Sequence, residues 1–388
     1  MQQMGGYKYM KIKKSISVIS LGIILALTGC GSNVTPSDNT PDQTPETVSE
    51  TQASGDTVTH DIIDTLPLNR HIKIDHIGLV TSEGGIDDES FNQSAWEGLQ
   101  RTSGSYDCEV KYVESDTIAD FKGNVDTILT DDMDLVWGIG YDCAQDMLNA
   151  ATEHPDVYFA MVDNTFEDLP SNMTGVVFRG QEPAFLAGFI AGNVTETDRI
   201  GFVGGVQNDV IDQFRYGFQG GVAYAAARLN KEIEVYAEYA DSFSDESTGK
   251  ELADKLYDED GCDIVFQAAG ATGLGVIESA KEHDLYVIGI DKDQSYLAPD
   301  NVLTSVLKYV SVAIYTVSGD YILGIDIGGK TVSLGLSDNS MGISGQHSLY
   351  SDDIYNTAMA LKDDIIAGNI VPPSNGPEYG KFVEWIWE

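Results

Sequence analysis

The chain of 388 residues contains 62 Asp and Glu against 22 Lys and Arg, so its formal net charge is −40. This balance excludes a nucleic-acid binder, which needs cationic side chains to meet the phosphates, and a protein held to anionic lipid by a basic patch. Hydrophobic residues make up 42% of the chain, enough for a large core, and the length favours two domains.

The first 29 residues have the pattern of an export signal. Lysines precede the apolar stretch 16–27, which is too short to cross about 30 Å of hydrocarbon as a helix. Residues 27–30, Leu-Thr-Gly-Cys, resemble the lipobox of bacterial lipoproteins, in which the cysteine is acylated and becomes the new N-terminus. We therefore expect a signal peptide at residues 1–29 and a lipid anchor on Cys30, which holds the protein outside the cytoplasm on the cell membrane. The alternative for Cys30 is an ordinary buried cysteine.

Residues 30–70 are rich in Ser, Thr, Pro and acidic side chains. Such a segment cannot bury enough apolar area to offset its ordering entropy, so we expect a disordered tether that leaves residues 71–388 as the folded body. Cleavage of the signal removes four lysines and no acid, which gives the exported chain a charge of −44. The remaining Cys108, Cys143 and Cys262 are odd in number and widely spaced, which predicts buried free thiols rather than disulfides or a zinc site.

The body repeats a pattern of strand, loop and helix. Continuous apolar runs, typical of strands, occupy residues 74–80, 135–139, 157–162, 199–205, 263–267 and 286–290. Helical periodicity follows or separates them at residues 90–102, 143–153 and 182–194. Continuous rather than alternating runs indicate strands that are covered on both faces, as in a parallel sheet flanked by helices. We therefore predict an α/β fold of doubly wound parallel sheets, with more strands than one sheet usually holds and hence two lobes.

Sheets of this kind bind ligands outside the carboxyl ends of their strands. This rule places four loops near a site: residues 81–92, 138–143, 267–275 and 291–295. In the third loop, glycines that include Gly270 allow the backbone to approach a ligand closely.

The first of these loops leads into a predicted helix. Ser90 and Gln93 are spaced as a capping box, which places Phe91 and Asn92 in the first helical turn. An aromatic side chain there is poorly placed for packing but well placed to stack on a planar ligand. The alternative for Phe91 is a hydrophobic staple at the helix cap.

Two further motifs lack the context that their chemistry requires. The loop 81–93 resembles the calcium-binding entrance of nucleoside hydrolases, but Thr81 stands where a carboxylate is needed, and Ca²⁺ takes six to eight oxygen ligands. Residues 324–331 match the P-loop formula, but a helical pattern at 310–323 precedes them and a strand pattern at 331–336 follows, the reverse of the P-loop order. The histidines are scattered, so we expect no catalytic residue, metal or cofactor.

The segment 77–98, which contains Ser90-Phe91-Asn92, resembles the opening of the basic membrane protein family, nucleoside-binding lipoproteins that serve ATP-binding-cassette (ABC) importers. Further segments match in order along the body, at residues 177–188, 200–205, 214–218, 263–275, 287–294 and 303–308. The resemblance implies a type I periplasmic-binding-protein fold, in which two lobes joined by three hinge crossings close on a ligand.

This fold also implies lobe boundaries. We expect an N-lobe at about residues 71–175 with a returning segment near 292–330. The C-lobe is expected at about residues 176–291, together with the C-terminal part of the chain.

The resemblance implies roles for individual residues as well. Phe91 corresponds to the aromatic residue that stacks on the base, and Asp291 and Lys308 correspond to the Asp and Lys that hold the ribose. The alternative for Asp291 and Lys308 is an interlobe salt bridge between them. A second aromatic residue is expected on the other side of the base, with Phe243 as the candidate and Phe178 as the reserve.

One position departs from the family. Many relatives carry an Asp that contacts the base where this chain has Ser82, so the preferred base is open. Asn92, Asp88 and Asp142 are further candidates for hydrogen bonds to the base edge. We expect a nucleoside ligand, with purine nucleosides favoured, an ABC permease as partner, no nucleic acid, a monomer and no enzymatic activity. The alternatives are a sensing lipoprotein for another small hydroxylated ligand and an enzyme similar to nucleoside hydrolases.

Overall fold

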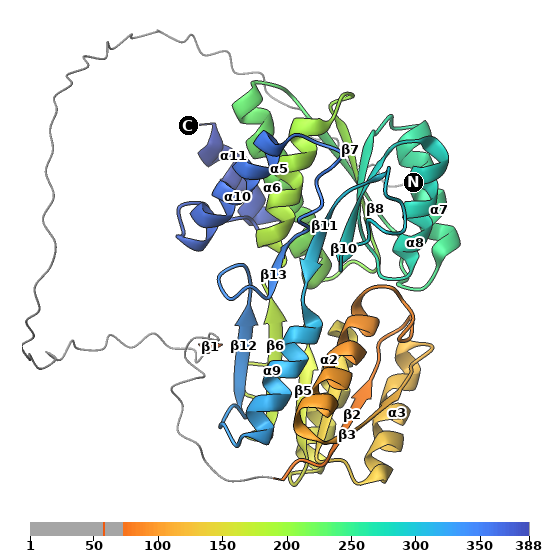
Figure 1. The fold of residues 1–388 in the computed structure, drawn as a ribbon, viewed down its shortest axis with the longest axis vertical. Coiled ribbons are helices and arrows are strands. Elements are labelled where there is room, and N and C mark those ends of the chain that lie inside the picture. The colour runs from red at the N-terminus through yellow and green to blue at the C-terminus, as the bar shows by residue number, and fades with distance from the viewer. Residues whose placement is uncertain (1–56, 59–72, 388) are drawn as a thin grey trace, which may run out of the picture. The chain divides into compact units, whose positions relative to one another are not determined.

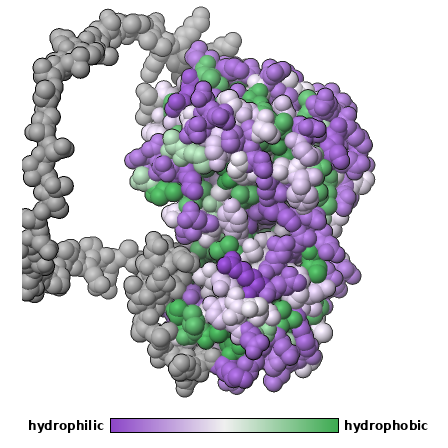
Figure 2. All heavy atoms as spheres, in the orientation of Figure 1, coloured by the Kyte–Doolittle hydropathy of each residue, from purple (hydrophilic) through white to green (hydrophobic). Residues whose placement is uncertain are grey.

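The computed structural model describes residues 57–58 and 73–387, all within the unit Ser54–Glu388 (Figure 1). The predicted signal peptide, Cys30 and nearly all of the predicted tether lie outside the described residues. The prediction of disorder is wrong at Thr57–Val58, which form a strand of the first sheet. Figure 2 shows that hydrophilic side chains cover most of the face in view, with apolar ones scattered among them. Among the described residues, no helix is both long enough and apolar enough to cross a membrane.

The first sheet consists of parallel strands in the order β1-β12-β6-β5-β4-β2-β3. Their bounds are β1 Thr57–Val58, β2 His76–Val80, β3 Glu109–Val113, β4 Leu135–Ile139, β5 Tyr158–Val162, β6 Met173–Phe178 and β12 Lys330–Leu334. Every residue of β4 is buried, as are the last four residues of β2 and of β5. The continuous apolar runs of the sequence are therefore strands covered on both faces.

The second sheet has the strand order β13-β11-β10-β9-β7-β8. Its bounds are β7 Arg199–Gly204, β8 Glu234–Tyr239, β9 Ile264–Ala268, β10 Tyr286–Asp291, β11 Val302–Lys308 and β13 Met341–Ile343. All neighbours are parallel except β13, which pairs antiparallel with β11 at the edge. The two sheets confirm the predicted class, an α/β fold with two doubly wound lobes.

Helices complete the two lobes (Figure 1). The first sheet is accompanied by α2 Phe91–Tyr106, α3 Phe121–Ile128, α4 Ala144–Glu153 and α9 Val310–Ile322, and together they form the first lobe. The second lobe contains the second sheet with α5 Gln181–Val194, α6 Asp209–Leu229, α7 Glu246–Asp258, α8 Thr272–His283, α10 Asp352–Ile366 and α11 Gly376–Ile386.

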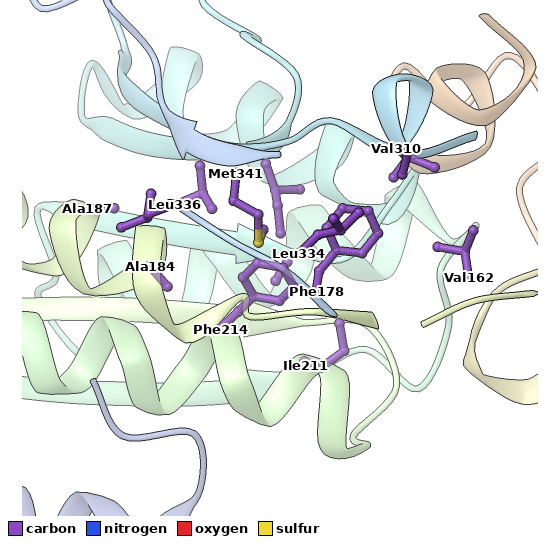
Figure 3. Packing of buried hydrophobic residues seen from close by; sticks show 14 of the residues in the cluster. Val162, Phe178, Ala184, Ala187, Ile211, Phe214, Val310, Leu334, Leu336 and Met341 are labelled. Carbon is purple, nitrogen blue, oxygen red and sulfur yellow. The ribbon is translucent and has the colours of Figure 1, made fainter. Parts of the chain in front are cut away.

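The chain crosses between the lobes at three places: β6 to α5, β11 to α9, and β12 to β13. Figure 3 shows buried apolar side chains gathered around these crossings, among them Phe178, Leu334 and Met341. Arg179 ties the first crossing to the third, because its guanidinium donates to the Ser333 carbonyl oxygen at 3.1 Å. The hinge is therefore fastened by both packing and hydrogen bonds.

The lobe boundaries differ in part from those expected. We expected a return to the N-lobe near residue 292, but β11 belongs to the second sheet, so the return comes only at α9. The first sheet likewise keeps the chain through Phe178, three residues beyond the expected boundary at residue 175. The reason is that β6 continues to Phe178 in the first sheet, and that β11 still pairs within the second sheet before the chain crosses.

Two smaller predictions are confirmed. The P-loop-like residues 324–331 follow helix α9 and run into the first two residues of strand β12, which is the wrong order for phosphate binding. Cys108, Cys143 and Cys262 are buried free thiols.

The crossing of α5 and α6 leads to a test of packing. A Cβ atom added at Gly188 would lie 2.0 Å from the Phe218 carbonyl oxygen. We expect Gly188→Ala to lower the free energy of unfolding by about 1–3 kcal/mol, because the two helices must move apart. Urea denaturation would measure this change.

The matched control is Gly104→Ala in α2, where an added Cβ has no neighbour within 4 Å. Alanine is a better helix former than glycine, so the free energy of unfolding of this variant should rise by up to about 1 kcal/mol. Equal effects of the two substitutions would contradict the close approach of α5 and α6.

Candidate functional site

A cavity of about 380 Å³ lies between the carboxyl-terminal ends of the two sheets. This volume is within the usual range for sites that take small molecules, roughly 300–1,000 Å³. Loops from both lobes line it, as expected from the strand ends. Nine of the ten predicted ligand-binding residues line the cavity: Ser82, Asp88, Phe91, Asn92, Asp142, Phe243, Gly270, Asp291 and Lys308.

The tenth residue, Phe178, does not reach the cavity. It is buried in the core, and its ring centroid lies 5.0 Å from the Lys308 ammonium. Phe178 therefore lies behind Lys308, whereas the candidate Phe243 lines the cavity.

Asp88 organises the start of α2. Its carboxylate accepts hydrogen bonds from the backbone N–H groups of Ser90, Asn92 and Gln93 at 2.9, 2.8 and 3.0 Å. The predicted Ser90–Gln93 capping box is wrong, because the Ser90 side chain makes no capping bond. Burial raises the pKa of Asp88, although these backbone bonds oppose the shift. The Asp88 carboxylate caps α2, so both of its oxygens already accept hydrogen bonds from the protein.

Ser82 and Asn92 are bonded to each other. The Asn92 side-chain oxygen accepts from the Ser82 backbone N–H at 3.1 Å and from the Ser82 hydroxyl at 3.0 Å. The Asn92 amide also donates to the Glu83 carbonyl oxygen at 3.1 Å. These bonds fix the loop that follows β2 against the start of α2.

Phe91 and Phe243 are half-buried aromatic side chains from opposite lobes, and both line the cavity. Phe91 lies in the first turn of α2, as predicted, and the Lys308 ammonium is 4.5 Å from its ring centroid. Phe243 follows β8, in the loop that leads to α7. The cavity therefore offers an aromatic side chain from each lobe.

Asp291 and Lys308 lie on neighbouring strands of the same sheet, with Asp291 opposite Leu307. The interlobe salt bridge between them, given above as the alternative, is therefore excluded by the topology. Each residue instead bonds to the first lobe. Lys308 pairs with both oxygens of Asp163, at 2.7 and 2.5 Å, and Asp291 accepts a hydrogen bond from the Ser90 hydroxyl.

The environment of Asp291 is close to dry. Burial raises the pKa of Asp291 to about 6, while the positive charge of Lys308 and the Ser90 hydroxyl oppose the shift. Asp291 therefore keeps its proton to a higher pH than an exposed aspartate does.

Sequence reasoning missed several lining residues, among them Glu83, Tyr141, Asp163, Asn208, Phe214 and Asp241. Asp163 had a recognisable signal. It directly follows the apolar run 157–162, as Asp291 follows the run 286–290, and both residues have left-handed backbones with φ of 71° and 64°. The four predicted loops omitted this strand end.

Further hydrogen bonds join the lobes beside the cavity. Glu83 of the first lobe accepts from the Ser244 hydroxyl of the second at 2.5 Å. Glu89 accepts from the Tyr296 hydroxyl and from Lys292, the latter at 3.1 Å, and these bonds lower the pKa of Glu89. The lobes are thus in contact around the cavity. In the part of the chain that the structure describes, no cluster of three or more His, Cys, Asp or Glu is arranged to hold a metal.

Comparison with known proteins places this geometry in a family. The sequence profile described as "ABC transporter substrate-binding protein PnrA-like" matches residues 76–375. Basic membrane protein B of Borreliella burgdorferi is 37% identical over 315 residues, covering 78% of this chain and 89% of that protein. Basic membrane protein A of Borreliella afzelii is 36% identical over 310 residues, covering 78% and 93%.

Solved structures show the same fold. An ABC transporter solute-binding protein from Aeropyrum pernix K1 superposes with a TM-score of 0.72 at 25% identity, covering 80% of this chain and 97% of that one. A solute-binding protein from Conexibacter woesei gives a TM-score of 0.62 at 21% identity, covering 77% and 98%.

The raised pKa of Asp291 predicts how its contribution to stability depends on pH. Between about pH 4 and pH 6 the folded protein keeps a proton on Asp291 that the unfolded chain releases, so the contribution of Asp291 to stability falls as pH rises through this window. We expect the free energy of unfolding of Asp291→Asn, relative to that of the wild type, to rise by on the order of 2 kcal/mol between pH 4 and pH 6.5. Above pH 6.5 the difference should stay constant. Asn tolerates the left-handed backbone, so the comparison isolates the charge.

Urea unfolding at several pH values would measure this difference. A difference between the two proteins that does not change between pH 4 and pH 6.5 would contradict the buried position of the Asp291 carboxyl.

Proposed function

The chain belongs to the PnrA-like family of ABC transporter substrate-binding proteins, and we propose that its cavity captures a nucleoside outside the cytoplasm and delivers it to a membrane permease. The observation that carries the proposal is one cavity with aromatic rings at Phe91 and Phe243 and a carboxylate–ammonium set at Asp291 and Lys308. A nucleoside has the matching parts, a planar base and a hydroxylated sugar.

The aromatic side chains supply the base subsite. Phe91 comes from the first lobe and Phe243 from the second, so closure of the lobes would bring both onto the faces of a planar ligand. Base–aromatic stacking accepts any base, since every base has a π-face. The stacking pair therefore explains affinity for bases in general rather than a choice among them.

The charged residues supply the sugar subsite. A carboxylate accepts hydrogen bonds from vicinal hydroxyls, and an ammonium donates to them. Asp291 and Lys308 lie side by side at the ends of β10 and β11, within reach of one sugar ring. Lys308 uses two of its three N–H donors on Asp163, which leaves one for a ligand.

The base edge would be read mainly by acceptors. Asp142 lies at the cavity wall, where burial and the nearby charge of Glu83 raise its pKa. The Ser82 hydroxyl adds a group that both donates and accepts. These acceptors suit the amino groups of adenine, guanine and cytosine, so they do not by themselves choose between a purine and a pyrimidine. We favour purine nucleosides, and the titration below tests this choice.

The proposal extends to the rest of the chain. We propose that residues 1–29 direct export, that a lipid on Cys30 anchors the protein, and that the stretch from Cys30 to the strand Thr57–Val58 acts as the tether. The folded part would then act as a monomer that binds and releases its ligand without chemical change. Transport is favoured over sensing because the family is one of ABC transporter proteins.

Isothermal calorimetry tests the proposed function. The purified protein is titrated with adenosine, guanosine, inosine, cytidine and uridine, and with free adenine and ribose as fragments. We expect saturable heat with at least one purine nucleoside and weaker binding of both fragments. Absence of heat and of any thermal shift with all five nucleosides would refute the nucleoside proposal and leave the fold intact.

Removal of the Phe91 ring tests the base subsite. Phe91→Ala should weaken nucleoside binding by about 1–3 kcal/mol, because a stacking face is lost. Phe91→Tyr keeps the ring and should bind within a factor of a few of the wild type, whereas Phe91→Leu keeps apolar volume without a ring. If Phe91→Leu binds as well as the wild type, stacking is not the interaction involved.

The sugar subsite predicts a pH dependence of affinity. An ionised Asp291 is the better acceptor for hydroxyl groups, so riboside affinity should fall as pH decreases through about 6, by at most about tenfold per pH unit. Asp291→Asn should remove this dependence and weaken ribosides while sparing the free base. Equal weakening of adenosine and adenine by Asp291→Asn would argue against a sugar contact.

A further inference from the structure

The two lobes place an aspartate at corresponding positions beside the cavity. Asp163 directly follows β5 of the first sheet, and Asp291 ends β10 of the second. Both have positive φ, 71° and 64°, a conformation that turns the chain sharply at the strand end. Each reaches the opposite lobe, Asp163 to Lys308 and Asp291 to Ser90.

The Asp163–Lys308 pair is almost dry. The side chains of Lys308 and Asp163 are only 3% and 8% exposed. A buried ammonium without a counter-charge is strongly unfavourable, and among the described residues lining the cavity Lys308 is the one cation. Aromatic rings surround it, with the centroids of Phe91 and Phe214 at 4.5 and 6.0 Å.

We propose that Asp163 is the positioning residue of the sugar site: it holds the Lys308 ammonium at the cavity wall from the opposite lobe, so that sugar recognition and lobe closure become one event. This inference rests on the proposed binding of a riboside. When the lobes separate, Asp163 and Lys308 are both free to take up water. When they close, the ion pair with Asp163 neutralises the ammonium. Two of its N–H groups then bond to Asp163, which fixes the direction of the third.

Asp163 therefore acts on the ligand through Lys308 and not by direct contact. Without the Asp163 charge, closure would bury Lys308 unpaired, and the population of the closed, binding-competent state would fall. Apparent affinity falls in proportion to that population. Because Asp163 lines the cavity, the alternative role is direct contact with the ligand. An experiment must distinguish this role from positioning of Lys308.

A double-mutant cycle does so. Riboside affinity is measured for Asp163→Asn, Lys308→Met and the double variant. We expect Asp163→Asn to weaken binding about tenfold to hundredfold in the wild-type background. In the Lys308→Met background the same substitution should cause no loss, because there it removes an unpaired buried carboxylate. Equal losses in both backgrounds would show direct ligand contact and overturn the proposal, as would an unchanged affinity of Asp163→Asn alone.

Asp284→Asn is the matched control. Asp284 lies in the second lobe, as Lys308 does, and also has a left-handed backbone, with φ of 54°, so the substitution removes the same charge without backbone strain. It is exposed at the end of α8 and does not line the cavity. Its riboside affinity should stay within about threefold of the wild type. A loss equal to that of Asp163→Asn would make the effect one of net charge alone and overturn the proposal.

A second cycle needs no ligand. Urea unfolding of the same four proteins should show coupling between Asp163 and Lys308 of at least about tenfold in the folding equilibrium constant. Lack of coupling would mean that the pair does not form, and would overturn the inference. Coupling combined with a failure of every nucleoside to bind would instead refute the proposed function and keep Asp163 as the residue that positions Lys308.

Discussion

The buried ammonium of Lys308 is the constraint on which the rest of the site depends. A charge that is 3% exposed needs a partner, and Asp163 supplies it from the other lobe, with both carboxylate oxygens. The bond can form only when the strand ends of both sheets meet. Closure, burial of the cavity and orientation of Lys308 in its wall are therefore the same structural event. Burial also raises the pKa of the neighbouring Asp291 to about 6, although the positive charge of Lys308 opposes this shift.

The acidity of the chain has a different meaning inside the cavity than outside it. On the face seen in Figure 2, hydrophilic side chains predominate, and the net charge of −40 favours solubility. The cavity wall contains the acids Glu83, Asp88, Asp142, Asp163, Asp241 and Asp291. Several of these have assigned partners: Asp88 caps α2, Asp163 pairs with Lys308, and Glu83 bonds across the lobes. Because acids outnumber Lys308, the one cation among the described residues of the wall, the wall disfavours a phosphorylated ligand and suits an uncharged one.

Much of the fold could be predicted because its strands are buried on both faces, so their apolar runs are continuous in the sequence. The strand ends then predicted the loops of the site. The place of Phe91 in the first helical turn was inferred from the capping box and is correct, although the box itself does not form. Other features depended on contacts between distant residues. Asp163 and Lys308 are 145 positions apart, and no local pattern pairs them. The capping box failed because Asp88, which precedes the helix, outcompetes Ser90 for the free N–H groups, and Ser90 turns to Asp291 instead.

The central claim is that one riboside lies between the lobes, with its base against Phe91 and Phe243 and its sugar against Asp291 and Lys308. A crystal structure of the protein grown with the tightest-binding nucleoside tests it most directly. The account predicts the base against Phe91 and Phe243, sugar hydroxyls within hydrogen-bond distance of Asp291 and Lys308, and the Asp163–Lys308 pair still formed. A nucleoside bound elsewhere, or one with its sugar against Phe91 and its base on Asp291, would contradict it.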